Sequence, residues 1–356
     1  MVNFTVGPVQ MDKETRKIGM NQIPYFRTPE FSEIMKENED LLCEFFGAPE
    51  NSRVVFLTGS GTASMEATVM NCFTKEDKVL VVNGGSFGHR LVELCIIHEI
   101  PYTEIKLEYG QALTKEKLEE YSNSNYTGML LQLCETSTGI LYDMKMVGQF
   151  CKENSIFLMV DAVSGFLADE FNMKDMNVNV AITGSQKALS LPPSMSFIVM
   201  DEVAQKRCSE NTVKSMYFDL NDYLKNGERG QTPFTPAVGT CLMLNEKLTR
   251  IAVSGGVKVE NQKAKEKANY FRNAIKDLPL KVFIAPEASS NCVTALMPTN
   301  GQSAYDIFTE IKDKYGMWIC PNGGDMKDTV FRVGHIGNIS KKELNKLIKV
   351  LHKVCK

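Results

Sequence analysis

The segments S-I-F-L-M-V-D-A-V-S (155–164) and N-V-A-I-T-G-S-Q-K (179–187) decide the fold expected for this chain. Each starts as a short, nearly continuous apolar run, which is typical of a strand buried on both faces of a parallel sheet. The first run ends at Asp161, and Lys187 follows the second run, 26 residues after Asp161. That separation is one β-α-β step, so we expect Asp161 and Lys187 to flank one crevice at the carboxyl edge of the sheet.

Five further apolar runs lie in the first two thirds of the chain and alternate with helical patterns. They span residues 53–58, 78–83, 102–107, 128–133 and 195–200. Together the seven runs predict an α/β fold in which a mostly parallel, seven-stranded sheet carries helices on both faces. Residues 201–250 follow the last run and show a mixed, loop-rich pattern.

The pattern changes from about Leu248 onward. A long polar helix is expected at 257–277, with helices also between and after a set of short strands near 281–285, 292–297, 317–320 and 329–333. We therefore predict a large domain over residues 16–250 and a smaller C-terminal α+β domain over 251–356.

Composition excludes several classes of protein. The 356 residues carry a formal net charge of −3, which argues against a nucleic-acid surface. We find no long uncharged apolar run and no secretory signal pattern, so we expect neither a membrane span nor export. Ten cysteines without C-x-x-C pairs indicate reduced thiols in a cytoplasmic protein. Only four histidines occur, none adjacent to another, and we expect no metal site.

Polar residues after the strand-like runs are the candidate functional groups, and each has two interpretations. Gly59-Ser60-Gly61-Thr62 follows the run 53–58 at a helix start, where backbone N–H groups can hold an anion; a plain strand-to-helix turn is the alternative. It is not a P-loop, because no Gly-Lys-Ser/Thr follows. Asp161 is either the partner of a cation or a helix N-cap. Lys187 is either a solvated loop lysine or a partly desolvated amine that serves as nucleophile or base.

These features converge on pyridoxal phosphate as the cofactor. This cofactor needs a lysine for a Schiff base, an acid beside its pyridinium nitrogen and a site for its phosphate. An aromatic ring stacked on the pyridine also helps, and Phe87 follows the second apolar run. Packing in the core is the alternative role for Phe87.

The chain resembles the class V aminotransferases of pyridoxal-phosphate fold type I over nearly its whole length. Within that class it is most similar to the group that holds the alanine–glyoxylate, serine–pyruvate and 2-aminoethylphosphonate–pyruvate aminotransferases. The motifs that carry the resemblance, in chain order, are F-T-V-G-P (4–8), T-G-S-G-T-A-S-M-E-A (58–67), N-G-G-S-F-G-H-R (83–90), E-T-S-T-G (135–139), V-D-A-V-S (160–164), G-S-Q-K-A-L (184–189) and F-R-V-G-H-I-G (331–337).

The resemblance implies a role for each matched residue. Lys187 corresponds to the lysine that binds the cofactor as a Schiff base and later carries the substrate proton. Asp161 corresponds to the acid that keeps the ring nitrogen protonated, and Arg332 to the arginine that binds the substrate α-carboxylate. The other implied contacts are the stacking ring of Phe87, the ring-binding hydroxyl of Thr136, and the phosphate contacts of Gly61, Thr62 and Gln186.

The resemblance also implies how the chain assembles. Thr235, in T-P-F-T-P-A-V-G (232–239), corresponds to the threonine that reaches the phosphate in the neighbouring subunit. We therefore expect a homodimer with active sites at its interface. The N-terminal segment 1–15, which contains Gly7-Pro8, corresponds to a segment that packs on the small domain and folds over the active-site entrance.

The implied activity is ping-pong transamination. The donor would be a small amine of the alanine, serine or 2-aminoethylphosphonate type, and the acceptor a small 2-oxo acid such as pyruvate or glyoxylate. One alternative is another class V enzyme, a lyase or a cysteine desulfurase, although desulfurases carry histidines where this chain has Gln186 and Phe87. The other alternative is a non-catalytic nucleotide-binding protein that uses Gly84-Gly85-x-x-Gly88, a spacing that departs from G-x-G-x-x-G.

Two positions depart from the family pattern. Ser194 and Leu167 stand where the family often has glycine. We expect these changes to bear on substrate preference rather than on cofactor use.

Overall fold

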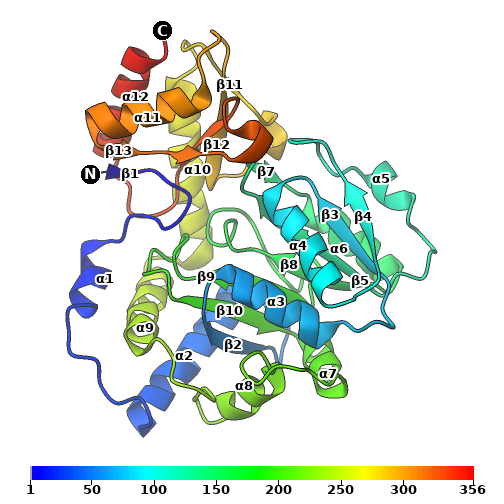
Figure 1. The fold of residues 1–356 in the computed structure, drawn as a ribbon. Coiled ribbons are helices and arrows are strands. Elements are labelled where there is room, and N and C mark those ends of the chain that lie inside the picture. The colour runs from blue at the N-terminus through cyan, green and yellow to red at the C-terminus, as the bar shows by residue number, and fades with distance from the viewer. Residues whose placement is uncertain (1) are drawn as a thin grey trace.

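The computed structural model describes residues 2–356, and Figure 1 labels its strands and helices. The central sheet has seven strands, in the spatial order β2 (Arg53–Thr58), β10 (Met195–Met200), β9 (Val180–Gly184), β8 (Phe157–Asp161), β5 (Gly128–Gln132), β3 (Val79–Asn83) and β4 (Tyr102–Lys106). All neighbours are parallel except β10, which runs antiparallel to both β2 and β9. The predicted sheet is confirmed, and each predicted strand end lies within two residues of the observed end.

Helices cover both faces of this sheet (Figure 1). One face packs against α3 (Gly61–Cys72), α4 (Ser86–Ile97), α7 (Glu202–Glu210) and α8 (Leu220–Gly227). The other face packs against α2 (Pro29–Phe46), α6 (Met144–Glu153) and α9 (Val238–Val253). Strands β5, β8, β9 and β10 are buried at every residue, which explains why their sequences are continuous apolar runs rather than alternating ones.

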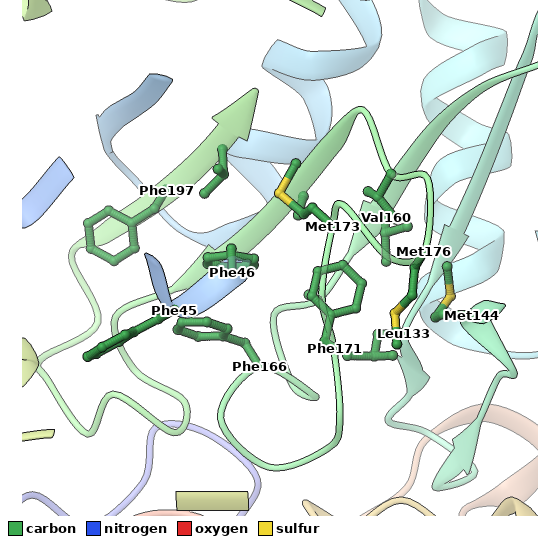
Figure 2. Close-up of a cluster of buried hydrophobic side chains, with 14 of the residues drawn as sticks. Phe45, Phe46, Leu133, Met144, Val160, Phe166, Phe171, Met173, Met176 and Phe197 are labelled. Atoms are coloured by element: carbon green, nitrogen blue, oxygen red, sulfur yellow. The ribbon is translucent and has the colours of Figure 1, made fainter. Parts of the chain in front are cut away.

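The connection between β8 and β9, residues 162–179, contains turns and no helix, so the predicted helical crossover is wrong. Its apolar side chains nevertheless fill the sheet face: Phe166 stacks on Phe46 of α2, with ring centroids 4.0 Å apart (Figure 2). Leu167 and Asn177 have φ values of +63° and +52°, a left-handed conformation that interrupts a helix. The positive φ of Leu167 also accounts for the glycine expected at that position.

Residues 201–250 are more helical than their sequence pattern predicts, because they form α7, α8 and most of α9. Helix α9 begins at Val238 with no side-chain cap from Ala237 and no acidic residue in its first turn. The usual signals of a helix start are therefore missing from the sequence at this point.

The C-terminal part has its own core around a four-stranded antiparallel sheet, ordered β11 (Leu280–Val282), β12 (Val293–Pro298), β15 (Phe331–Gly334) and β14 (Cys320–Pro321). Three helices accompany it: α10 (Gly256–Ala274), α11 (Ala304–Tyr315) and α12 (Lys341–Val354). Each of the four predicted strand regions contains a strand. The domain boundary proposed at residue 250 falls in the last turns of α9, and we keep it as a proposal.

The N-terminal residues lie against the C-terminal part (Figure 1). Strand β1 (Val2–Asn3) pairs in parallel with β13 (Met317–Trp318), and Phe4 is fully buried in the C-terminal core. The chain then passes through α1 (Lys13–Ile18) to α2. The remaining elements are short: α5 (Lys115–Glu119) and the hairpin of β6 (Cys134–Glu135) and β7 (Ile140–Leu141). Within residues 2–356, we find no helix with the length and apolarity needed to cross a bilayer.

Candidate active site

A cavity of about 250 Å³ lies at the carboxyl edge of the central sheet. Asp161, the last residue of β8, and Lys187, just beyond β9, both line it, as the spacing of these residues in the sequence predicts. The other lining residues are Gly7, Pro8, Ser60, Gly61, Thr62, Met65, Phe87, Arg90, Thr136, Val163, Ser164, Gln186 and Pro193. Seven of the nine predicted site residues therefore meet in one cavity, and only Arg332 and Thr235 lie outside its lining.

The loop that carries Lys187 is held in shape by the buried hydroxyl of Ser185. This hydroxyl donates to the carbonyl of Pro192 at 2.6 Å and accepts from the backbone N–H of Met195 at 3.2 Å, which ties the two ends of the loop together. Lys187 forms part of the cavity wall. Its side chain is buried there, and burial lowers the pKa of its amine. A lysine with a lowered pKa is more often a neutral amine, the form that acts as a nucleophile or base.

Asp161 is buried, and burial raises the pKa of its carboxyl group to about 6. The backbone N–H of Val163 donates to its Oδ1 at 2.9 Å and opposes the shift, as do the positive charges of Lys187 and Arg90. Since no helix follows Asp161, its alternative role as a helix N-cap is excluded. Asp161 instead lines a cavity that is also lined by two basic side chains, Lys187 and Arg90.

Helix α3 begins at the cavity with Gly61, and the side chain of its N-cap residue, Ser60, makes no capping hydrogen bond. The backbone N–H groups of Gly61 and Thr62 thus remain available to an anion, whereas that of Ala63 donates to the carbonyl of Ser60 at 2.9 Å. A side chain at position 61 would collide with Val163, because a Cβ atom there would lie 2.8 Å from the Val163 Cγ2. Glycine therefore lets the helix start approach the strand end that carries Asp161.

Helix α4 also begins near the cavity, but a protein carboxylate already occupies its N-terminus. The backbone N–H groups of Phe87 and Gly88 both donate to Glu135 Oε2, at 3.0 Å and 2.9 Å. Glu135 is fully buried and also accepts from the hydroxyl of Ser137. The turn at residues 84–88 is thus filled by Glu135, which argues against its use as a dinucleotide site.

Arg90 lines the cavity in addition to the seven predicted site residues. Its guanidinium donates to Thr62 Oγ1 at 3.0 Å and lies 5.0 Å from the centroid of the Phe87 ring. Arg90 thereby links the first turn of α3 to the aromatic ring on α4. Its spacing of three residues from Phe87 on one helix face is the signal that could have found it.

Thr136 and Ser164 form another part of the wall, with their hydroxyl oxygens 2.6 Å apart. Arg332, on β15, reaches this wall from the C-terminal part and donates to the backbone carbonyl of Thr136 at 3.0 Å. Its second terminal nitrogen donates to the carbonyl of Pro321, at 2.9 Å. Both terminal nitrogens of Arg332 are therefore held by carbonyls beside the cavity.

Thr235 and Ser194 do not face this cavity. Thr235 is exposed in the loop between α8 and α9. The hydroxyl of Ser194 lies 2.7 Å from that of Thr240 on α9, so this departure from the family pattern points away from the cavity.

The N-terminal segment covers Lys187. Val9 donates its backbone N–H to the carbonyl of Gln186 at 3.1 Å, and Gly7 packs directly on the lysine side chain. A Cβ atom at Gly7 would lie 2.8 Å from Lys187 Cδ and 3.0 Å from Nζ, and Gly7 has a φ of +151°. Only glycine fits here without displacing the lysine or straining the backbone.

Comparison with known proteins agrees with this geometry. Residues 24–320 match the family described as aminotransferase class V. The chain belongs to the class V aminotransferases. An uncharacterized aminotransferase of Helicobacter pylori strain J99 is 30% identical over 343 residues, which cover 95% of this chain and 89% of that protein.

Two relatives with named activities show the same likeness. An L-aspartate–glyoxylate aminotransferase of Paracoccus denitrificans is 27% identical, with 95% of this chain and 86% of that protein covered. The crystal structure of an alanine–glyoxylate aminotransferase from a Nostoc species superposes with a TM-score of 0.93 at 24% identity, covering 100% of this chain and 95% of that one. The latter likeness confirms the predicted fold.

Class V aminotransferases use pyridoxal phosphate, which is therefore the cofactor of this chain. The cavity residues fit it on two observations. The N-terminus of α3 is open to a phosphate, and Asp161 is buried close to Lys187 and Arg90. Among residues 2–356, no cluster of three or more histidine, cysteine, aspartate or glutamate side chains could hold a metal ion.

We predict that Gly7→Ala impairs the site through Lys187. The added methyl group has to displace the lysine side chain, which should lower turnover by about tenfold or more. Visible absorbance of the bound cofactor and steady-state rates would measure the effect. Gly323→Ala is the matched control, because Gly323 has a φ of −118° and no atom within 4 Å of a Cβ placed there. Equal activity of the two variants would contradict the contact.

Proposed function

We propose that this enzyme moves the amino group of a small donor, of the alanine, serine or 2-aminoethylphosphonate type, to a small 2-oxo acid such as pyruvate or glyoxylate. The two half-reactions would follow a ping-pong sequence, with one product leaving before the second substrate binds. The observation that carries the proposal is a buried lysine and a buried aspartate that line one cavity beside an open helix N-terminus. Glyoxylate as acceptor is also supported by the name of the Paracoccus relative.

The phosphate of the cofactor would be held at the start of α3. Gly61 and Thr62 offer backbone N–H groups there, and the side-chain amide of Gln186 lines the same cavity. Arg90 fixes the Thr62 hydroxyl and brings a positive charge to this end of the site. A phosphate is favoured in such a place both by the helix dipole and by charge-assisted hydrogen bonds.

When bound, pyridoxal phosphate supplies the carbon that takes up the amino group and a ring that withdraws electrons from the substrate α-carbon. Lys187 would anchor it covalently. Once a donor has displaced the lysine, its free Nζ would accept the α-proton and return a proton one step later. The lowered pKa suits both tasks, because a neutral amine accepts a proton and the resulting ammonium releases it readily.

Asp161, Phe87 and Thr136 would orient the ring. The carboxylate of Asp161 would accept a hydrogen bond from the protonated ring nitrogen, which stabilises that charge in a buried place. Phe87 lines the cavity from α4 and offers a flat face for stacking, while the Thr136 hydroxyl lies on another part of the wall.

Arg332 would bind the α-carboxylate of each substrate. The carbonyls of Thr136 and Pro321 hold its two terminal nitrogens in one plane, and its guanidinium can still offer further N–H groups to a carboxylate. Its positive charge also helps to lower the pKa of Lys187. A carboxylate bound there would stand next to the lysine, which suits a reaction at the α-carbon.

We further propose a cytoplasmic homodimer in which Thr235 contacts the phosphate of the neighbouring subunit. Thr235 is exposed rather than directed into the cavity of its own chain. Three large apolar side chains of the extended segment before α2 are also exposed, namely Met20, Ile23 and Tyr25, and a subunit contact would cover them. The cytoplasmic location is supported by ten free cysteines.

The donor can be identified by a single half-reaction. Wild-type enzyme loaded with cofactor is mixed separately with alanine, serine, aspartate and 2-aminoethylphosphonate, without a 2-oxo acid. We expect at least one to abolish the visible absorbance band as its amino group is transferred. Lys187→Ala should lack that band and all turnover, whereas Lys174→Ala, a change at an exposed lysine, should behave as wild type. Turnover by Lys187→Ala, or protein that stays colourless with added cofactor, would refute the proposal.

Protonation of Asp161 should control cofactor binding. In the cofactor-free protein its pKa is raised to about 6, so the carboxylate needed for the ring nitrogen is lost as the pH falls through that value. We expect the affinity of the cofactor-free protein for pyridoxal phosphate to drop between about pH 7 and pH 5 more steeply in wild type than in Asp161→Asn. The cofactor phosphate titrates equally in both, so parallel profiles would rule out the contact.

Arg332→Lys should weaken substrate binding rather than cofactor binding. Lysine keeps the charge but loses the planar pair of donors, so KM for the 2-oxo acid should rise by about tenfold to a hundredfold. The absorbance of the bound cofactor should not change. Arg16→Lys, at an exposed arginine on α1, is the control. An unchanged KM in Arg332→Lys would show that another group binds the carboxylate.

A further inference from the structure

A second cavity, of about 350 Å³, lies next to the active site and shares none of its lining residues. Ala188 and Ser190, which follow Lys187 in the same loop, form part of its wall, and so does Leu167. The rest of the wall comes from the start of α1, from α9, from α10 and from the loop after β15. The cavity therefore lies between the central sheet and the C-terminal part, behind the loop that carries the lysine. Its volume falls in the range of small-molecule sites.

His335 lies in the wall of this cavity. Its side chain is almost fully buried, and its Nε2 lies 2.7 Å from Thr294 Oγ1. The same Thr294 oxygen accepts from Arg272 Nε at 2.9 Å. The Thr294 proton is therefore best donated to His335 Nε2, which leaves the proton of the neutral ring on Nδ1. Nδ1 is buried and has no hydrogen-bond partner in the structure, so the ring itself is not fully satisfied.

Lys267 places a positively charged side chain in the wall of this cavity, and no carboxylate within residues 2–356 forms an ion pair with it. Its Nζ donates to the carbonyl of Gly337 at 3.2 Å. The other cations on the wall that are not exposed, Lys247 and Arg250, both pair with Asp12, at 3.1 Å and 2.8 Å. Burial lowers the pKa of Lys267, because its ammonium is partly shielded from water, and the charges of Lys247 and Lys263 add to the shift.

The carboxylates on the wall form no ion pair with Lys267, although the charge of Glu260 partly opposes the fall in its pKa. Asp12 is engaged by Lys247 and Arg250, and Glu260 pairs with the exposed Lys263 at 2.7 Å. Glu14 is largely exposed and lies 3.8 Å from Arg250. The cavity thus combines carboxylates that pair with other cations and one half-buried ammonium, that of Lys267, that forms no ion pair.

We propose that this cavity binds a small oxyanion, the carboxylate or phosphate group of a small molecule, through Lys267 Nζ. The anion would form a charge-assisted hydrogen bond with Lys267 and neutralise its half-buried ammonium. Because Lys267 belongs to the C-terminal part and Ala188 to the lysine loop, a bound anion would connect the two beside the active site. The site is separate from Arg332 and does not depend on the proposed substrates.

Calorimetric titration of the cofactor-loaded enzyme tests this site. The two probes are succinate, which has neither an amino nor an oxo group to transfer, and inorganic phosphate. We expect at least one probe to bind and Lys267→Gln to weaken that binding at least tenfold, as the loss of a charged hydrogen bond predicts. Lys267→Arg, which keeps the charge, should retain most of the affinity. The probe that binds more tightly identifies the oxyanion.

Two controls separate this cavity from the rest of the protein. Lys265→Gln removes a charge from an exposed residue of the same helix that does not line the cavity, and it should bind the probes as wild type does. Arg332→Lys should also keep the binding, because its effect is confined to the active site. The proposal is overturned if neither probe binds, if Lys267→Gln binds normally, or if Arg332→Lys abolishes the binding. Unchanged visible absorbance of Lys267→Gln would verify that the variant is folded.

Discussion

The structure depends on two opposite charges held where there is little water. Asp161 and Lys187 stand at the edge of a sheet whose central strands are buried at every residue, so neither charge is well solvated. Burial raises the pKa of the aspartate and lowers that of the lysine, while the two groups partly oppose these shifts in each other. The pKa of each group is thereby brought closer to neutral pH than it would be in water. For Lys187, the proposed acceptor of the substrate proton, a pKa nearer neutral pH suits acid–base chemistry at a carbon atom.

Two helices begin at this edge of the sheet. One N-terminus binds a carboxylate of the protein itself, and the other is free to bind an anion of the cofactor. The N-terminus of α4 is occupied by Glu135, whose buried carboxylate accepts two backbone hydrogen bonds from the helix. Helix α3 is left open, and glycine at its first position allows it to approach Asp161. Both starts offer the same backbone donors, so the presence or absence of one acidic side chain decides which of them can accept a phosphate.

Much of this arrangement could be predicted because it follows from local patterns. Continuous apolar runs identified all seven strands, and the residues just after them identified the cavity. The prediction failed where the local pattern was ambiguous. The connection from β8 to β9 buries Phe166 against Phe46 without forming a helix (Figure 2), and α9 forms without a capping residue. In both cases packing against distant residues outweighs the local signals.

The sequence by itself determined which side chains end the strands, and hence that a lysine and an aspartate share one crevice. Only the tertiary structure decided what surrounds them. Gly7 lies on Lys187 and Arg90 holds Thr62, whereas Ser194 turns to Thr240 instead of the cavity. Strand ends are set by a repeating pattern of buried residues, which neighbouring positions encode. Contacts such as that of Gly7 with Lys187 join residues far apart in the chain, and no local pattern encodes them because they arise only once the core has packed.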